Sequence, residues 1–129
     1  ANFIGKANFV ECEYKELKDG VAYAKVGEMP LVVPNPGKVK VNTGEKCCLS
    51  IRPESIKLVS EGSGIPGVIS RATYFGSKIE YEVEIADNYL VIEMYNPQLS
   101  LVFNEGDHVK AQLDMECVRI LKAEETRIE

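Results

Sequence analysis

The chain has 129 residues, of which 45% are hydrophobic and 27% charged, and its formal net charge at pH 7 is −5. This mixture is typical of one globular domain that buries its own core, and it excludes a disordered or fibrous chain. The apolar runs are too short for a membrane-spanning helix, and we expect no secretion signal. Because residue 1 is Ala rather than Met, we expect a chain that is processed or cut from a longer protein.

Charge is distributed unevenly between the two halves. Residues 1–64 carry nine Lys and Arg against eight Asp and Glu, whereas residues 65–129 carry six against twelve. Proteins that bind nucleic acids generally present a basic face to the phosphate backbone. The acidic second half therefore argues against nucleic-acid binding.

Apolar and polar residues alternate with a period of two in the first half, which predicts half-buried antiparallel strands. In chain order these are a strand at residues 10–14, a turn at Asp19–Gly20 and a returning strand at 21–26. Two shorter strands follow at 31–33 and 39–41, separated by a turn rich in Pro and Gly.

The alternation continues in the second half. Pro53–Ser55 is expected to form a single helical turn, because Pro suits the first turn of a helix. Residues 78–95 predict a hairpin with its turn at Asp87–Asn88. Residues 109–116 predict one more strand.

A segment of the first half returns 62 residues later. Residues 44–58 align with residues 106–120, and each copy follows an Asn-Pro pair. About ten short strands with frequent turns predict an all-β, closed or nearly closed barrel. We expect one domain over residues 1–129, built from two similar and intertwined half-repeats at 1–60 and 65–122, with a charged tail at 123–129.

No group of side chains predicts a reaction. His108, the one histidine, has no nucleophile signature around it. Glu80, Glu82 and Glu84 share one face of a predicted strand, and a solvated face explains them better than a metal or acid–base site. No Gly-rich phosphate loop occurs. We therefore expect no catalytic, cofactor-binding or metal site, and no enzyme activity in this fragment.

The four cysteines are Cys12, Cys47, Cys48 and Cys117. None of them has the Cys-x-x-Cys spacing of a zinc knuckle or a redox motif. Cys47 and Cys48 are adjacent, so on a strand they face opposite sides of the sheet. We expect small core thiols in a reducing cytosol, with one thiol more exposed.

Three segments together carry a family resemblance. They are Asn-Phe-Ile-Gly at 2–5 with Asn8, Ser-Ile-Arg-Pro-Glu-Ser-Ile at 50–56, and Gly-Val-Ile at 67–69 followed by Tyr-Phe-Gly at 74–76 and Tyr-Glu-Val at 81–83. In this order they resemble the C-terminal transport-associated OB (TOBE) domain of ABC importer ATPases of the spermidine/putrescine, iron(III) or sugar type. The resemblance extends over essentially the whole chain and implies an OB-like barrel.

The resemblance also implies a function. The chain would be a non-catalytic regulatory and dimerisation domain, coupled to ATP-driven solute import, and ATP and Mg²⁺ would bind to an N-terminal domain that this fragment lacks. Its partners would be a second copy of the subunit, transmembrane permease subunits and, in some members, a small-molecule or protein regulator. It would lie in the cytoplasm, at the inner face of the membrane.

Five residues are candidates for interaction or regulation. Arg52, Pro53 and Glu54 match the family motif residue by residue, whereas the second repeat keeps only the Glu. Tyr74 and Phe75 are aromatic side chains that could stack on a ligand, although at strand spacing such residues more often pack in the core or at the rim. Two alternatives stay open, namely a free-standing OB domain that binds a small ligand or an oxyanion and, less favoured, an OB fold that binds nucleic acid.

Overall fold

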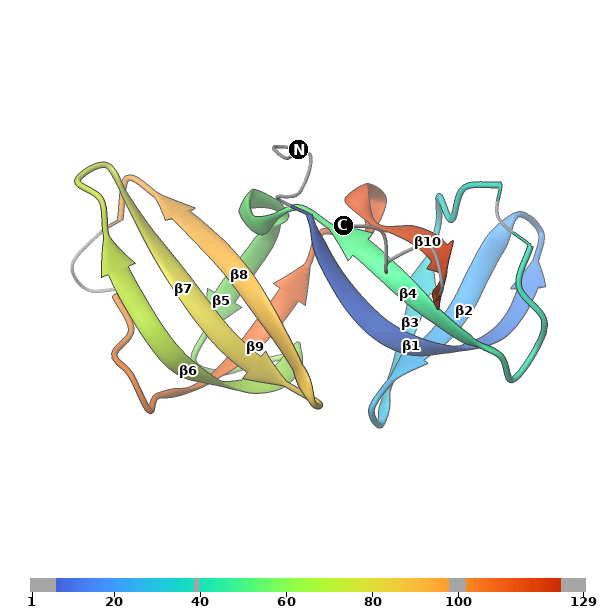
Figure 1. The fold of residues 1–129 in the computed structure, drawn as a ribbon, viewed down its shortest axis with the longest axis horizontal. Coiled ribbons are helices and arrows are strands. Elements are labelled where there is room, and N and C mark those ends of the chain that lie inside the picture. Colours follow the sequence, from blue (N-terminus) through green and yellow to red (C-terminus); the bar gives the residue numbers. More distant parts are fainter. Residues whose placement is uncertain (1–6, 39, 98–101, 124–129) are drawn as a thin grey trace.

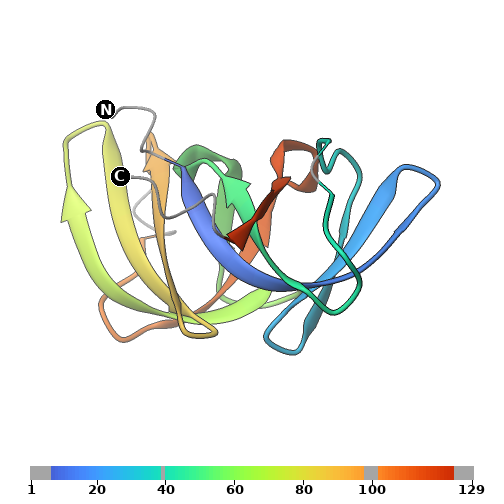
Figure 2. The same ribbon diagram turned by 45° about the vertical axis from the view of Figure 1, so that its right-hand side comes forward.

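The structure of the protein is a computed structural model that describes residues 7–38, 40–97 and 102–123. Within these ranges, ten strands form two five-stranded sheets that lie side by side (Figure 1). All the pairings are antiparallel, and each sheet curls strongly into a half-open, OB-like barrel (Figure 2). The predicted all-β, OB-like fold with about ten antiparallel strands is confirmed.

The two sheets have equivalent orders. Sheet A runs β10-β4-β1-β2-β3 and sheet B runs β5-β9-β6-β7-β8. The strands of sheet A are β1 (Asn8–Lys18), β2 (Val21–Val26), β3 (Met29–Val33), β4 (Lys46–Ile51) and β10 (Arg119–Lys122). The strands of sheet B are β5 (Ile56–Val59), β6 (Ile65–Tyr74), β7 (Lys78–Ile85), β8 (Asn88–Tyr95) and β9 (His108–Leu113). Two 3₁₀ turns, η2 (Pro53–Ser55) and η4 (Met115–Cys117), precede β5 and β10.

Each half of the chain contributes its last strand to the other sheet. β5 follows η2 and pairs with β9 in sheet B, whereas β10 follows η4 and pairs with β4 in sheet A. The predicted intertwining of the halves is therefore present, and neither half alone contains a complete sheet. The limits 1–60 and 65–122 of the half-repeats stay a prediction, and residues 124–129 of the predicted tail lie outside the described residues.

The alternating strands bury one continuous core that draws on both sheets. Tyr81 of β7 is the largest fully buried side chain, and its hydroxyl accepts a hydrogen bond of 3.0 Å from the backbone N–H of Phe103. This bond satisfies a polar group that would otherwise be costly to bury. Gly67 of β6 also faces the core, where a Cβ atom would lie 2.7 Å from Cγ1 of Ile85. The core therefore leaves no room for a side chain at this position.

The sheets meet where β1 of sheet A faces β8 of sheet B, at the centre of Figure 1. The buried side chain of Asn8 donates a hydrogen bond to the carbonyl of Val91 and accepts one from the Val91 N–H, both at 2.8 Å. One carboxamide thus satisfies both backbone groups of a residue on the edge strand β8. Nearby, Oδ1 of Asn88 accepts a hydrogen bond of 3.2 Å from the Glu11 N–H.

Two local predictions need correction. The predicted strand at 39–41 is wrong, because Lys40 and Val41 lie in no strand, and residue 39 lies outside the described residues. The preceding Pro36 instead accepts a hydrogen bond of 2.9 Å from the Ile120 N–H, so this segment covers the edge of β10.

The hairpin at 78–95 is confirmed, but its turn is displaced by one residue. Ala86 and Asp87 form the turn with φ of 44° and 67°, values typical of a two-residue type I′ turn. Asn88 already belongs to β8, and its side-chain amide donates to the Ala86 carbonyl at 3.0 Å.

The expectation of four thiols is also wrong, because Cys12 and Cys47 form a disulfide. The two residues face each other in the register of β1 and β4, with their Cα atoms 5.2 Å apart, a distance that suits a disulfide. Their separation of 35 residues gave no sign of this in the sequence. Of the other two cysteines, Cys48 is buried and Cys117 is exposed.

Candidate interaction surface

The Arg52–Glu54 motif occupies the crossing from sheet A to sheet B. Pro53 starts η2, because its fixed φ suits a first turn, and it is buried, whereas Arg52 and Glu54 are exposed. η2 packs against β8. The side chain of Arg52 makes no capping hydrogen bond to the turn, so it projects from the crossing without a structural role in η2.

Tyr74 and Phe75 lie at the end of sheet B where β6 turns into β7. Both are exposed, at 58% and 53%, so the expected alternative of packing in the core does not hold for them. Tyr74 pairs with the buried Ile79 and therefore lies on the core-facing side of the sheet. Phe75 belongs to the turn, where its N–H donates to the Lys78 carbonyl at 2.9 Å.

Lys78 links Phe75 to the end of β8. Its Nζ lies 5.5 Å from the ring centroid of Phe75 and 5.7 Å from that of Tyr95, which are distances of cation–π contacts. The same ammonium forms an ion pair of 3.0 Å with Glu93, and the Tyr95 hydroxyl donates to that carboxylate at 2.8 Å. We call Phe75, Lys78, Glu93 and Tyr95 the Lys78 cluster.

The electrostatics of the Lys78 cluster follow from the nearly buried Glu93 carboxylate, whose side chain is 5% exposed. The hydrogen bond to Glu93 is the main cause that raises the pKa of Lys78 above its usual range. The same carboxylate, by accepting from the phenol, is the main cause that raises the pKa of Tyr95. The charge of Glu54 makes the smallest of the contributions that raise the pKa of Tyr95.

The structure thus brings together part of the predicted set. Phe75 belongs to the Lys78 cluster, Arg52 and Glu54 lie at the crossing, and Tyr74 lies on the core-facing side of the sheet. The analysis of the sequence missed Lys78, Glu93 and Tyr95. The signal that could have found them is a charged residue in a mainly apolar strand. Glu93 interrupts the apolar residues of β8, shares the outer face of that strand with Tyr95, and lies opposite Glu80 of β7.

A pocket of about 600 Å³ opens beside this surface, between β5 and the end of β8. Apolar side chains line much of it, and Tyr95 belongs to both the pocket and the Lys78 cluster. The main apolar lining residues are Leu58, Met94, Pro97, Val102 and Phe103.

The remaining chemical candidates lie on solvated surfaces. His108 is exposed at the start of β9, and Glu80, Glu82 and Glu84 lie on the face of β7 opposite the core, as predicted. Among the described residues, no three His, Cys, Asp or Glu side chains gather in a way that could hold a metal ion. No helix in the described ranges is long and apolar enough to cross a membrane.

The fold is a β domain of two sheets, in which each half of the chain contributes one strand to the sheet of the other half. Exposed aromatic and charged side chains lie on sheet B and at the crossing that contains η2. A family model described as "TOBE domain" matches residues 49–121. The chain belongs to the TOBE domain family.

The relatives that are similar in sequence include two import ATP-binding proteins. The spermidine/putrescine import ATP-binding protein PotA 1 of Pseudomonas aeruginosa is 32% identical over 93 residues, which cover 70% of this chain and 25% of the relative. The Fe(3+) ions import ATP-binding protein FbpC of Brucella abortus is 33% identical over 97 residues, covering 71% of this chain and 25% of the relative. The chain thus spans about a quarter of the length of these relatives.

Solved structures with the same fold include a molybdate-binding protein. The cytoplasmic molybdate-binding protein ModG superposes with a TM-score of 0.75, covering 94% of this chain and 99% of ModG. The sequence identity is 13%, so this likeness concerns the arrangement of the strands.

Proposed function

We propose that this chain is the C-terminal regulatory and dimerisation domain of an ATP-binding subunit of an ABC importer. The observation that carries the proposal is the family match, together with relatives that are import ATP-binding proteins about four times as long as their matching segment. In such a subunit ATP and Mg²⁺ bind to a preceding domain, and the present chain has no catalytic role. The subunit works in the cytoplasm, at the inner face of the membrane, where its ATP-binding domain contacts permease subunits.

The proposed contact with a second copy of the subunit is the surface that carries Arg52, Phe75 and Tyr95, all of which are exposed. Arg and aromatic side chains are enriched among the residues that contribute most to binding at protein interfaces. Arg52 is available for this role because it makes no capping bond to η2. Phe75 and Tyr95 are held in place by Lys78, which lowers the entropy that they lose on association.

Dimerisation of this domain would affect transport through proximity. Two subunits joined here present their ATP-binding domains to each other at a raised effective concentration, without a new contact at the nucleotide. A regulator that prefers one arrangement of the two β domains would shift activity by the difference between its two affinities.

The test has two steps. The gene upstream of Ala1 should encode a phosphate loop of the form Gly-x-x-x-x-Gly-Lys-Ser/Thr, and a gene without it overturns the proposed parent. In the full subunit, sedimentation equilibrium should give a dimer that Arg52→Ala weakens about tenfold. Arg71→Ala is the matched control, because Arg71 is also exposed but lies on β6, the middle strand of sheet B, and not at the crossing. Equal dimer affinities for both variants would place the contact elsewhere.

A second candidate function is binding of a small ligand or an oxyanion by a free-standing domain. The observation that favours it is the superposition on ModG, whose whole length this chain matches. Calorimetric titration of the isolated chain with molybdate, tungstate and phosphate tests it. Saturable binding together with a gene that encodes no ATP-binding domain would favour this function over the first.

A further inference from the structure

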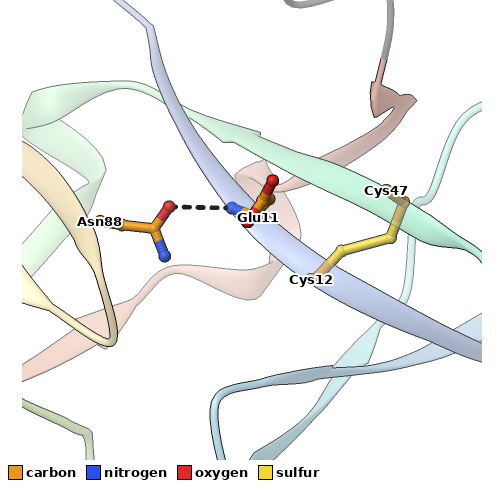
Figure 3. Close-up of a disulfide and its surroundings, with 4 residues drawn as sticks. All are labelled: Glu11, Cys12, Cys47 and Asn88. Carbon is orange, nitrogen blue, oxygen red and sulfur yellow. Dashed lines mark hydrogen bonds between the residues drawn. A yellow bond between two sulfur atoms is a disulfide. The ribbon is translucent and has the colours of Figure 1, made fainter.

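Strand β1 carries two features that lie next to each other. Cys12 forms the disulfide with Cys47 of β4, and the neighbouring Glu11 donates its N–H to Asn88 of β8 (Figure 3). Four residues before Cys12, Asn8 exchanges its two hydrogen bonds with Val91, also on β8. Within the five residues 8–12, β1 is therefore bonded covalently to β4 of its own sheet and by hydrogen bonds to β8 of sheet B.

The disulfide is shielded in this arrangement. Cys12 is 6% exposed and Cys47 is fully buried, because both side chains point into the core beside Val10 and Leu49. Thiol–disulfide exchange requires a thiolate to approach one sulfur atom. Because so little of either residue is exposed, we expect exchange to be slow while β1 stays in place and to become faster when β1 moves away from the core.

We propose that the disulfide and the contacts of Asn8 and Asn88 with their partners form a redox-sensitive latch between the two sheets. While the contacts hold β1 against β8, the disulfide is protected. When β1 is released, Cys12 becomes accessible and is reduced. Once reduced, β1 is tied to β4 by hydrogen bonds alone, and its contacts with β8 open more often.

The chemistry needs two equivalents of a small thiol. The first thiolate attacks Sγ of Cys12, the more exposed of the two residues, and the S–S bond breaks as the electron pair leaves on Cys47, which then takes up a proton. A second thiolate attacks the sulfur of the reductant in the mixed disulfide, and the electron pair leaves on Cys12, which is also protonated. Two thiols of the reductant become one disulfide, and the protein gains two electrons and two protons.

The coupling acts in both directions. If the equilibrium constant for reduction is larger by some factor in the open arrangement, the reduced protein favours the open arrangement by the same factor. Disulfides are rare in a reducing cytosol, and those that occur there are usually transient and redox-sensing. In the cytoplasm, the compartment proposed above, this latch would therefore respond to the small thiols that keep the cytosol reducing.

The rate of reduction tests the protective role. Native protein is treated with dithiothreitol, quenched with iodoacetamide at intervals, and analysed by intact mass. Asn8→Ala should accelerate reduction about tenfold and Asn88→Ala about threefold, since each removes hydrogen bonds that hold β1. Asn88→Asp is the matched control, because it keeps an oxygen that accepts from the Glu11 N–H, and its rate should stay within about twofold of the wild type.

A control separates the latch from general loss of stability. Ile79→Ala removes core volume from the end of β7 that pairs with Met94, away from the part of β8 (residues 88–91) that contacts β1, and lowers global stability. Its reduction rate should stay near that of the wild type. The proposal is overturned if Ile79→Ala is reduced as fast as Asn8→Ala, if the Asn variants match the wild type, or if the native protein already carries four alkylated cysteines.

The reverse direction is read from amide exchange. The Val91 N–H bonds directly to Asn8, so its hydrogen exchange in reduced protein should be at least about fivefold faster than in oxidised protein. The Phe75 N–H, bonded to the Lys78 carbonyl at the far end of sheet B, should exchange equally in both. Equal exchange at Val91 in the two redox states would refute the coupling, whatever the reduction rates.

Discussion

The backbone N–H of Asp114 donates to the carbonyl of Ser55 at 3.0 Å, so the two crossings between the sheets are bonded to each other. Ser55 ends η2 and Asp114 immediately precedes η4. These crossings are the same region in the two repeats. This bond therefore fixes the position of η2 relative to η4.

Removal of the side chain that precedes each 3₁₀ turn should change the free energy of unfolding by different amounts at the two crossings. Asp114 accepts from the Glu116 N–H at 3.2 Å and so caps η4, whereas Arg52 makes no equivalent bond to η2. Asp114→Ala should lower the free energy of unfolding by about 1 kcal/mol, and Arg52→Ala should change it by less than about 0.5 kcal/mol. Urea denaturation of both variants measures the difference, and an equal loss would mean that Arg52 has a structural role.

Titration of Tyr95 should depend on Glu93. The hydrogen bond from the phenol to this carboxylate raises the pKa of Tyr95 above its ordinary value of about 10. In Glu93→Gln the pKa should fall toward that ordinary value. The tyrosinate absorbance of each protein, taken as a difference from the corresponding Tyr95→Phe variant, isolates this group. Glu80→Gln on the adjacent strand should leave the pKa of Tyr95 unchanged.

Alkaline pH should weaken the Lys78 cluster. The pKa of Lys78 is raised in the folded protein, mainly by the bond to Glu93, so the folded state holds this proton more tightly than the unfolded state. The contribution is fully present below the unfolded value of about 10.4 and is lost as pH rises through the higher folded value. The pKa of Tyr95 is also raised, which gives the same sign.

Thermal unfolding followed by circular dichroism from neutral to alkaline pH measures this loss. Lys78→Arg should keep part of the stability at high pH, because Arg stays charged. A melting temperature that falls identically with pH in the wild type and in Glu93→Gln would contradict the assignment.

Gly67→Ala should be one of the more destabilising small substitutions in the protein. The added Cβ would lie 2.7 Å from Cγ1 of Ile85 and 2.9 Å from the Glu84 carbonyl oxygen, and a backbone atom cannot simply rotate away. We expect a loss of about 2–3 kcal/mol in urea unfolding. Gly20→Ala is the comparison, since its φ of 77° is unfavourable but its Cβ meets nothing within 4 Å; its loss should be nearer 1 kcal/mol. A larger loss for Gly20 would contradict this ranking.

Much of the fold follows from local pattern. The hairpin at 78–95 and the turn at Asp19–Gly20 were predictable because alternation and turn chemistry act within a few residues. The prediction of a strand at 39–41 was wrong because alternation does not tell which sheet edge is free for pairing, and Pro36 already bonds to the edge strand β10. The disulfide was not predicted for a related reason, since only the register of β1 on β4 brings Cys12 opposite Cys47.

The candidate surface was predictable only in part. Arg52–Glu54 stood out through resemblance, and the turn carrying Phe75 through its aromatic residues. The Lys78 cluster itself was not predictable, because it depends on Lys78 reaching across to Glu93 on the neighbouring strand. On β7 alone, Lys78 reads as one more solvated charge of an alternating strand. Its partner becomes visible once the pairing of β7 with β8 is known.

The exchange of β5 and β10 has a consequence for how such a chain could arise. A single half-repeat would have four strands of one sheet and a fifth that fits only another copy. Two identical chains could complete each other by swapping that strand, as a domain-swapped pair. Gene fusion through the loop at residues 60–64 would then turn a concentration-dependent association into a permanent one. In this hypothesis the present fold corresponds to a domain-swapped homodimer joined into one polypeptide. Its two halves differ at equivalent positions, such as Arg52 and Asp114.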